Sequence, residues 1–448
     1  MPVRLICLLV VGCLFSSCRG PQPTIPEASA IERSSIQAAL EGHLDAWFPR
    51  IIDSVNGGYY CRFTFDWTRE TDQPKMMVTQ ARGLWLASVA AKQFPAEQEF
   101  KSAAQHGFTF LVDSMWDEQG GGFRLDLHSP EAAIPHKLTY AHAFGLYALA
   151  AYAHIDSNPV SISWVQKAFY WMDSVAYDTE TGGYRTLIFE EEADVEAAEW
   201  RQKVKKLGWG EWNWKDQNTS IHVLEALTET YMVWPDSLVG VRLAEMLHLI
   251  RDTMVQPEGY LGLYFNPDWK AISNRHKGRE AILADLHHDH RSFGHDIETA
   301  FLLVEAAEVL YGEADSLTWK IARRLVDHTL DHGFDERYAG LYYEGYLFPG
   351  EDTVAIVNPA KIWWAQAEAW HALGLFADHF PQQQRYREAY RNMWTYMQTY
   401  IIDPEYGGWY EQGLDQGDSL QFEAKAHPWK GGYHDGRALL NRYKVSAK

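Results

Sequence analysis

The chain alternates between two kinds of helical pattern, and together they predict about twelve helices in pairs. Apolar residues recur at helical spacing in stretches such as VLEALTETYMVW and AFLLVEAAEVLY. The first helix of many pairs has a polar side, whereas the second is apolar nearly all round, which is typical of a helix buried on both sides. The predicted ranges are 34–53, 77–94, 98–116, 138–155, 160–176, 218–234, 236–255, 295–312, 315–333, 360–380, 383–402 and 433–444.

A glycine-rich turn followed by aromatic or strand-forming residues recurs between the helix pairs. Each copy predicts a tight turn that leads into a short hairpin strand. The copies stand about 60 to 80 residues apart, near Gly57, Gly121, Gly182, Gly262, Gly340 and Gly407.

Twelve paired helices with alternating burial predict an all-α fold, an (α/α)6 barrel of two concentric rings with short β-hairpins in its loops. We expect residues 34–448 to form this single catalytic domain. A helical solenoid is the alternative, although its repeats are usually shorter and more uniform. A barrel of this kind has a funnel on one face, and polar residues that interrupt the inner helices are its candidates for chemistry.

Composition fits a large core and restricts the partners. The chain has 448 residues, of which 46% are hydrophobic and 14% aromatic, and its formal net charge is -20. This charge argues against nucleic acid or an anionic membrane surface as a partner, so we expect a small neutral ligand and a monomer or dimer.

The N-terminal segment predicts export. Arg4 precedes an apolar run of about ten residues, which is too short to span a bilayer. VVGC at Cys13 and FSSC at Cys18 both resemble a bacterial lipoprotein box, and Cys18 is favoured because the chain turns polar directly after it. Residues 1–17 are then a signal peptide and 18–33 a tether, which predicts a lipid-anchored protein facing the periplasm of a Gram-negative bacterium. A plain secretory signal is the alternative. Cys61 and Cys18 alone form no disulfide framework.

Polar side chains interrupt the predicted inner helices near their starts. A buried ionisable group costs several kcal/mol unless it is paired, so convergence of such groups at the mouth of a barrel indicates a site rather than packing. The candidates are Arg82, His142, Asn218, His222, Glu225, His295, Glu298, Trp364, Glu368, Trp429 and His434.

Four motifs resemble those of the N-acylglucosamine 2-epimerase superfamily, and within it those of the cellobiose and mannobiose 2-epimerases. They are NTSIH, SFGHDIE, WWAQAE and WKGGYHDGR, and the resemblance extends from about residue 34 to the end. It implies an (α/α)6 barrel and inversion of C2 at a reducing-end sugar without a cofactor.

The resemblance also implies roles for individual residues. The two acid/base histidines correspond to His295 and His434. The arginine that stabilises the enediolate and a further histidine correspond to Arg82 and His222. The supporting polar residues correspond to Asn218, Glu298 and Glu368, and the sugar-stacking tryptophans to Trp364 and Trp429.

Three positions depart from the usual disaccharide-epimerase pattern. Ser220 replaces the first histidine of an N-T-H-x-H motif, and Asp435 stands where asparagine is common. His142, in YAHAF, stands where glutamine is frequent and resembles the mannose and sulfoquinovose isomerases. The substrate, and the choice between epimerase and aldose–ketose isomerase, therefore stay open.

The chemistry itself calls for these residue types. The C2 proton of an open-chain aldose requires a base with a pKa near the working pH and a donor for the developing enediolate oxygen. Histidine suits both directions of transfer, and inversion needs one on each face, for which we expect His295 and His434. Arg82 would stabilise the enediolate, His222 would assist ring opening, and Glu298, one turn from His295, would fix its tautomer.

Three competing hypotheses use the same residues differently. His287, His288, His290 and His295 could bind a metal, but H-E-x-x-H and a cysteine cluster are both missing from the sequence, so we expect no metal and no cofactor. A glycoside hydrolase would use two carboxylates among Asp296, Glu298 and Glu368. A lipid-anchored glycan-binding protein would keep the tryptophans but would not need the histidines or Arg82.

Overall fold

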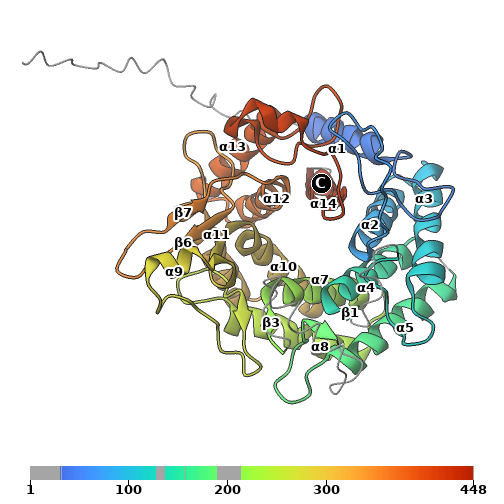
Figure 1. The fold of residues 1–448 in the computed structure, drawn as a ribbon, viewed down its shortest axis with the longest axis horizontal. Coiled ribbons are helices and arrows are strands. Elements are labelled where there is room, and N and C mark those ends of the chain that lie inside the picture. The colour runs from blue at the N-terminus through green and yellow to red at the C-terminus, as the bar shows by residue number, and fades with distance from the viewer. Residues whose placement is uncertain (1–30, 32, 128–136, 157, 189–212, 447–448) are drawn as a thin grey trace, which may run out of the picture.

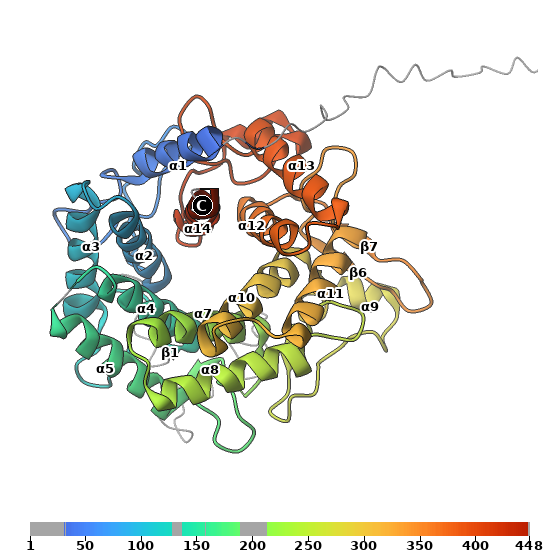
Figure 2. The ribbon, with the colours of Figure 1, turned by 180° about the vertical axis from the view of Figure 1, so that it is seen from behind.

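The computed structural model describes residues 31, 33–127, 137–156, 158–188 and 213–446, and within these ranges twelve long helices form two concentric rings (Figures 1 and 2). The inner ring consists of α2 (Met77–Gln93), α4 (Thr139–Ala153), α7 (Gln217–Val233), α10 (Phe293–Tyr311), α12 (Trp363–His379) and α14 (Tyr433–Ser446). The outer ring consists of α1 (Arg33–Trp47), α3 (Gln98–Phe110), α5 (Pro159–Ala176), α8 (Ser237–Leu249), α11 (Ser316–His332) and α13 (Gln384–Tyr400).

Contacts between neighbouring helices close the barrel. Each inner helix packs on the next one in the chain, α14 packs back on α2, and each outer helix packs on an inner helix. This arrangement confirms the predicted (α/α)6 barrel and all twelve predicted helices. Boundaries differ by a few residues: the first helix ends at Trp47 rather than 53, and single π-helical turns at Leu111–Met115 and Ile250–Met254 extend α3 and α8.

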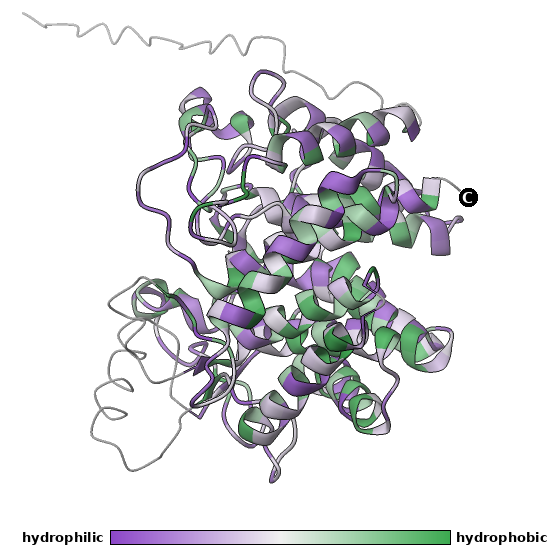
Figure 3. Cartoon of the chain, turned by 90° about the vertical axis from the view of Figure 1, so that its right-hand side faces the viewer, coloured by the Kyte–Doolittle hydropathy of each residue, from purple (hydrophilic) through white to green (hydrophobic). Residues whose placement is uncertain are grey.

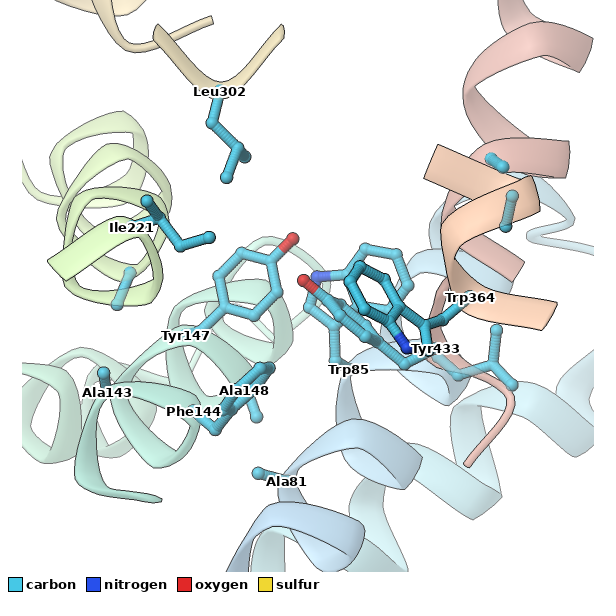
Figure 4. Close-up of a cluster of buried hydrophobic side chains, with 14 of the residues drawn as sticks. Ala81, Trp85, Ala143, Phe144, Tyr147, Ala148, Ile221, Leu302, Trp364 and Tyr433 are labelled. Atoms are coloured by element: carbon cyan, nitrogen blue, oxygen red, sulfur yellow. The ribbon is translucent and has the colours of Figure 1, made fainter. Parts of the chain in front are cut away.

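The hydrophobic pattern explains which helices lie inside. In α4, thirteen residues from Thr139 to Tyr152 are buried, on every side of the helix. In α13 the buried residues, among them Tyr386, Met393 and Met397, follow helical spacing along one face. In a side view coloured by hydropathy, hydrophilic and hydrophobic residues alternate along the helices (Figure 3). Trp85, Tyr147 and Tyr433, from three inner helices, meet at the barrel centre (Figure 4), where Trp85 stacks on Tyr147 at 5.6 Å.

The six glycine turns adopt one design within the described chain. Each closes on a single antiparallel bridge, which joins Ile52 to Tyr59, Trp116 to Phe123, Tyr177 to Tyr184, Val255 to Leu261, Phe334 to Leu341, and Ile402 to Trp409. Left-handed backbone at the turn glycines, such as Gly57 with φ 81°, explains the residue choice. In the fourth turn the left-handed residue is Gly259, whereas Gly262 does not adopt positive φ, so the sequence placed this turn three residues too late.

Short antiparallel strands hold the starts of three inner helices. β1 (Lys137–Leu138) pairs with β2 (Leu187–Ile188) directly before α4, and β3 (Lys215–Asp216) pairs with β4 (Tyr264–Phe265) directly before α7. Before α10, β5 (Arg291–Ser292) pairs with β6 (Glu344–Tyr346), which also pairs with β7 (Ala355–Asn358). These pairings fix the first turns of the inner helices, where the candidate residues lie.

The predicted signal peptide, Cys18 and all but residues 31 and 33 of the tether lie outside the described residues. Within the described ranges, no helix combines the length and the apolar character that crossing a membrane requires.

Candidate active site

The first turns of the inner helices surround a cavity of about 330 Å³. Eight of the ten predicted catalytic or supporting residues line it: Arg82, Asn218, His222, His295, Glu298, Trp364, Trp429 and His434. Glu368 lies directly behind His434, and His142 lies elsewhere. The structure therefore brings together nine residues that are widely separated in the sequence.

Helix register decides which side chains reach the cavity. Residues two and six positions into an inner helix, counted from its first residue, are four apart and therefore share one face. Asn218 and His222 occupy these positions in α7, Trp364 and Glu368 occupy them in α12, and Arg82 takes the second of them in α2.

His142 belongs to a different face, and its predicted place in the site is a correction. It lies two residues beyond Tyr140, which does line the cavity, and two residues turn an α-helix by about 200°. Its Nδ1 atom instead accepts a hydrogen bond from the Phe123 backbone N–H at 3.3 Å, and Nε2 contacts the Ala168 carbonyl at 3.2 Å. Gln80 and Gln366 occupy the same helix position and bind the backbone of their own turns, so His142 is a structural brace.

Arg82 is a buried guanidinium without an ion-pair partner among the described residues. One of its terminal nitrogens donates to the Trp429 carbonyl at 3.0 Å and the other to the Tyr140 hydroxyl at 3.2 Å. Its charge also lies over the Phe144 ring at 4.5 Å. Such a group attracts negative charge that develops in the cavity.

His222 is held by an ionised carboxylate. Its Nδ1 lies 2.9 Å from Oε2 of Glu225, which also accepts hydrogen bonds from Tyr433 and Arg437. Burial tends to raise the pKa of Glu225, but the Arg437 charge and these hydrogen bonds bring that pKa down to about 2. His222 therefore keeps its proton on Nδ1 and leaves Nε2 for the cavity.

His434 shares a short contact with Glu368. Its Nδ1 lies 2.6 Å from Oε1 of Glu368, and the same oxygen forms an ion pair with Arg437 at 2.7 Å. Burial raises the pKa of Glu368 well above its usual value, and the neighbouring Glu298 carboxylate adds to this. Burial, with the charges of Arg82 and Arg437, lowers the pKa of His434. The pair is therefore neutral overall, with one proton between Oε1 and Nδ1.

His295 has a hydroxyl partner rather than a carboxylate. Its Nδ1 lies 2.7 Å from the Ser292 hydroxyl, and burial lowers its pKa to about 3, so the ring is neutral. The expected contact with Glu298 does not form. The Glu298 carboxylate instead accepts a hydrogen bond from Arg437 and lies 4.0 Å from Nδ1 of His434. His295 and His434 both lie against the Trp364 ring, with centroids 4.7 and 5.5 Å away.

The four neighbouring histidines of the sequence do not form one set of metal ligands among the described residues, although His287, His290 and His295 line a second cavity. His288 pairs with Asp285 at 2.8 Å, His290 faces Glu344 at 3.5 Å, and His287 contacts the Tyr264 hydroxyl at 2.8 Å. Within the described residues, the carboxylate and histidine atoms that lie close enough to share an ion belong instead to Glu298, Glu368 and His434. Arg437 already forms ion pairs with both of these carboxylates and supplies the positive charge there.

Comparison with known proteins identifies relatives of this chain. The model of the N-acylglucosamine 2-epimerase family matches residues 57–437. The chain belongs to this family.

Relatives of the chain include cellobiose 2-epimerases. The enzyme of Bacteroides fragilis is 26% identical over 408 residues, which cover 89% of this chain and 94% of the relative. The cellobiose 2-epimerase structure from Bacillus thermoamylovorans has a TM-score of 0.76 at 25% identity and covers 92% of this chain and 99% of that chain. A D-mannose isomerase structure has a TM-score of 0.78 at 20% identity, with 92% and 98% covered, which shows the shared fold. Family membership confirms the resemblance and the expectation of a carbohydrate epimerase.

Sequence reasoning missed several residues of this epimerase-family cavity: Tyr140, Tyr343, Ile362, Trp363 and Glu411. Tyr140 has the same helix position as Asn218 and Trp364, so helix register could have found it. Glu411 and Tyr343 come from the strand side of two turns, and no pattern in the sequence places them. Glu411 is held near His427 and Lys430, whose charges and hydrogen bonds outweigh burial and lower its pKa.

Proposed function

We propose that the protein is a sugar 2-epimerase that inverts C2 at the reducing end of a mannose/glucose-type aldose or β-linked disaccharide. One observation carries the proposal: two neutral histidines, His295 and His434, flank Trp364 in one cavity, next to the unpaired charge of Arg82. The cellobiose 2-epimerases among the relatives support the substrate class.

The reaction begins with the open-chain aldose, whose C1 carbonyl acidifies the proton on C2. One histidine takes this proton through Nε2, and the electron pair moves to the carbonyl oxygen to give an enediolate. The other histidine then returns a proton to C2 on the opposite face, which inverts the configuration. The first histidine then releases its extra proton to solvent and the second takes one up from solvent, so the cycle closes without a cofactor.

The partners of the two histidines suit a reversible reaction. In the neutral pair one proton lies between Oε1 and Nδ1 and Nε2 of His434 carries the other, which it can give to C2. After that transfer the Glu368 carboxylate keeps the remaining proton on Nδ1, so the free Nε2 can act as a base. The Ser292 hydroxyl can donate to Nδ1 of His295 or accept from it, with the same consequence. Each histidine can therefore serve as the base for one epimer and as the acid for the other.

The remaining cavity residues fit the binding of a polyol and the charge that develops on it. Arg82 has no carboxylate partner in the described chain, and its charge would stabilise the enediolate oxygens. His222, oriented by Glu225, would exchange the ring oxygen proton during opening. Trp429 is 47% exposed at the rim and offers an apolar face for a sugar ring, as does Trp364 deeper in the cavity.

Incubation with cellobiose, mannobiose, glucose and mannose in deuterated water tests the proposal by NMR. We expect the C2 epimer of at least one sugar, with deuterium at C2. A ketose product would indicate an aldose–ketose isomerase, and cleavage to shorter sugars a hydrolase, so either result would contradict the proposal.

Single variants test the two-base mechanism itself. We expect His295→Asn and His434→Asn each to abolish inversion, while the remaining histidine still exchanges the C2 proton of one epimer with solvent. The two variants should retain this exchange with opposite epimers. If one variant keeps full inversion, or if both exchange the same epimer, the assignment of the two histidines is wrong.

A further inference from the structure

A buried lysine–aspartate pair recurs beneath the glycine turns. The aspartate directly follows the bridged residue of its turn, and the lysine comes from the segment that leads into the next inner helix. Five turns of the described chain have this pair: Asp53–Lys75, Asp117–Lys137, Asp178–Lys215, Asp335–Lys361 and Asp403–Lys425. In four of these pairs the lysine nitrogen lies 2.7 to 3.0 Å from the carboxylate oxygen, and Lys425 also contacts Asp403, so the charge under each of the five turns is compensated within the protein.

The fourth turn departs from this design at both partners. Its bridge joins Val255 to Leu261, one residue closer than in the other turns. Gln256 takes the position of the aspartate, and Arg291, two residues before α10, takes the position of the lysine. The Gln256 amide donates to the carbonyls of Thr253 and Met254. Because this amide is neutral, it cannot compensate the positive charge of Arg291 as an aspartate would.

Arg291 is consequently a buried cation that no carboxylate of the described chain contacts directly, and Asp296 and Asp289 act on its charge only from a longer distance. The residue is 3% exposed, and it forms no ion pair with any residue in the described ranges. Its guanidinium lies 3.2 Å from the centre of the Tyr260 ring, Nε has no hydrogen-bond partner, and one terminal nitrogen reaches the Asp289 carbonyl at 3.5 Å. Burial lowers the pKa of Arg291, which reflects the cost of holding this charge out of water.

A cavity of about 290 Å³ adjoins this cation. Arg275 provides a second guanidinium in its lining, and Glu258 and Asp289 provide two carboxylates. One oxygen of Asp289 is occupied by Ser273, the backbone of Asn274 and Tyr346, whereas the other has no partner. The cavity thus offers donors for an oxyanion and acceptors for hydroxyl groups.

We propose that this cavity binds a small polyhydroxylated anion, a sugar phosphate or a sugar acid, whose phosphate or carboxylate takes the place of the missing aspartate beside Arg291. The hydroxyls of the ligand would donate to Glu258. The site is separate from the cavity at Arg82 and does not depend on the proposed epimerase activity.

Calorimetric titration of the full mature protein with glucose 6-phosphate, glucuronate and glucose tests this site. We expect one or both anions to bind at a site that glucose does not occupy, so saturating glucose, a candidate substrate for the Arg82 cavity, should not displace them at matched ionic strength. The anion that binds distinguishes a phosphate ligand from a carboxylate ligand. Displacement of the anion by glucose, or no binding of either anion, overturns the proposal.

Three variants locate the binding. Arg291→Met should weaken it by about tenfold to a hundredfold, as expected for loss of a charged hydrogen bond. Gln256→Asp should weaken it to a similar degree and raise Tm without ligand, because it restores the pair seen in the other turns. Arg82→Met, the matched control in the other cavity, should leave it unchanged. If Arg291→Met does not fold, Gln256→Asp decides, and full anion binding in that variant refutes the site.

Discussion

Replacing Glu368 by glutamine tests how His434 is activated. The carboxylate is fully buried behind His434, and a single oxygen of it meets both His434 Nδ1 at 2.6 Å and Arg437 at 2.7 Å. Glutamine has the same shape and can still accept a hydrogen bond through its oxygen. It cannot share a proton with the ring or carry the charge that stabilises an imidazolium.

The size of the effect follows from these contacts. A hydrogen bond to a charged group contributes about 1.5–3 kcal/mol, which corresponds to roughly a 10- to 150-fold decrease in kcat. KM should change less than about threefold, because Glu368 lies behind the cavity wall and an interaction realised only in the transition state affects kcat. The amide nitrogen would face the position of Oε2, which has no partner, so we also expect a loss of about 1–3 kcal/mol in stability.

Steady-state epimerisation, followed from both epimers, measures these changes. Glu229→Gln is the matched control, since Glu229 also pairs with a histidine, His154 at 3.0 Å, but lies seven residues beyond His222 on α7. It should retain kcat. Full kcat in Glu368→Gln would refute the shared-proton argument, and a raised KM at constant kcat would assign Glu368 to substrate binding instead.

Four further predictions concern other parts of the protein. Lys361→Met leaves two buried aspartates without their cation and should cost about 3–5 kcal/mol in urea unfolding; an unchanged midpoint would contradict this. Burial lowers the pKa of His142 to about 3. Between about pH 6.5 and pH 3 the unfolded chain therefore binds a proton that the folded protein does not, so the protein becomes less stable as the pH is lowered. His142→Gln should reduce this loss by up to about 1.4 kcal/mol per pH unit and preserve kcat, whereas a large drop in kcat would return His142 to the site. Trp429→Ala should raise KM about tenfold with little change in kcat, as expected for about 1.4 kcal/mol of stacking lost at the rim. Cys18→Ala should move the protein from the membrane to the soluble fraction, and continued membrane association would exclude the lipid anchor.

Periodicity was sufficient to predict the barrel because burial and helical spacing are local properties of the sequence. The predicted range 360–380 is only slightly longer than α12. The helix begins at Trp363, just after Lys361, whose side chain pairs with Asp335. The six turns were also visible, because left-handed backbone restricts the residues that can form them. The sequence does not reveal the length of a turn, and the fourth turn, with its left-handed residue at Gly259 rather than near Gly262, is one residue shorter than the others.

Partners of the catalytic side chains were harder to predict than the side chains themselves. Spacing along one helix suggested that Glu298 holds His295, but the contact that forms joins Ser292 to His295 across the start of α10. Arg437 went unnoticed although it compensates Glu225, Glu298 and Glu368 together. These contacts join residues up to 212 positions apart, and their geometry depends on how the rings close.

Comparison of equivalent positions around the ring separates structural polar residues from chemical ones. Four positions into an inner helix, Gln80, His142, Asp296 and Gln366 all bind the backbone of the preceding turn, so a histidine there carries no catalytic implication. Two and six positions in, the side chains differ from helix to helix because each contacts a different part of the cavity. The same reasoning applies to the turns. Five of the six described turns keep a compensated cation and the fourth does not, and the anion that we propose beside Arg291 would supply the charge missing there.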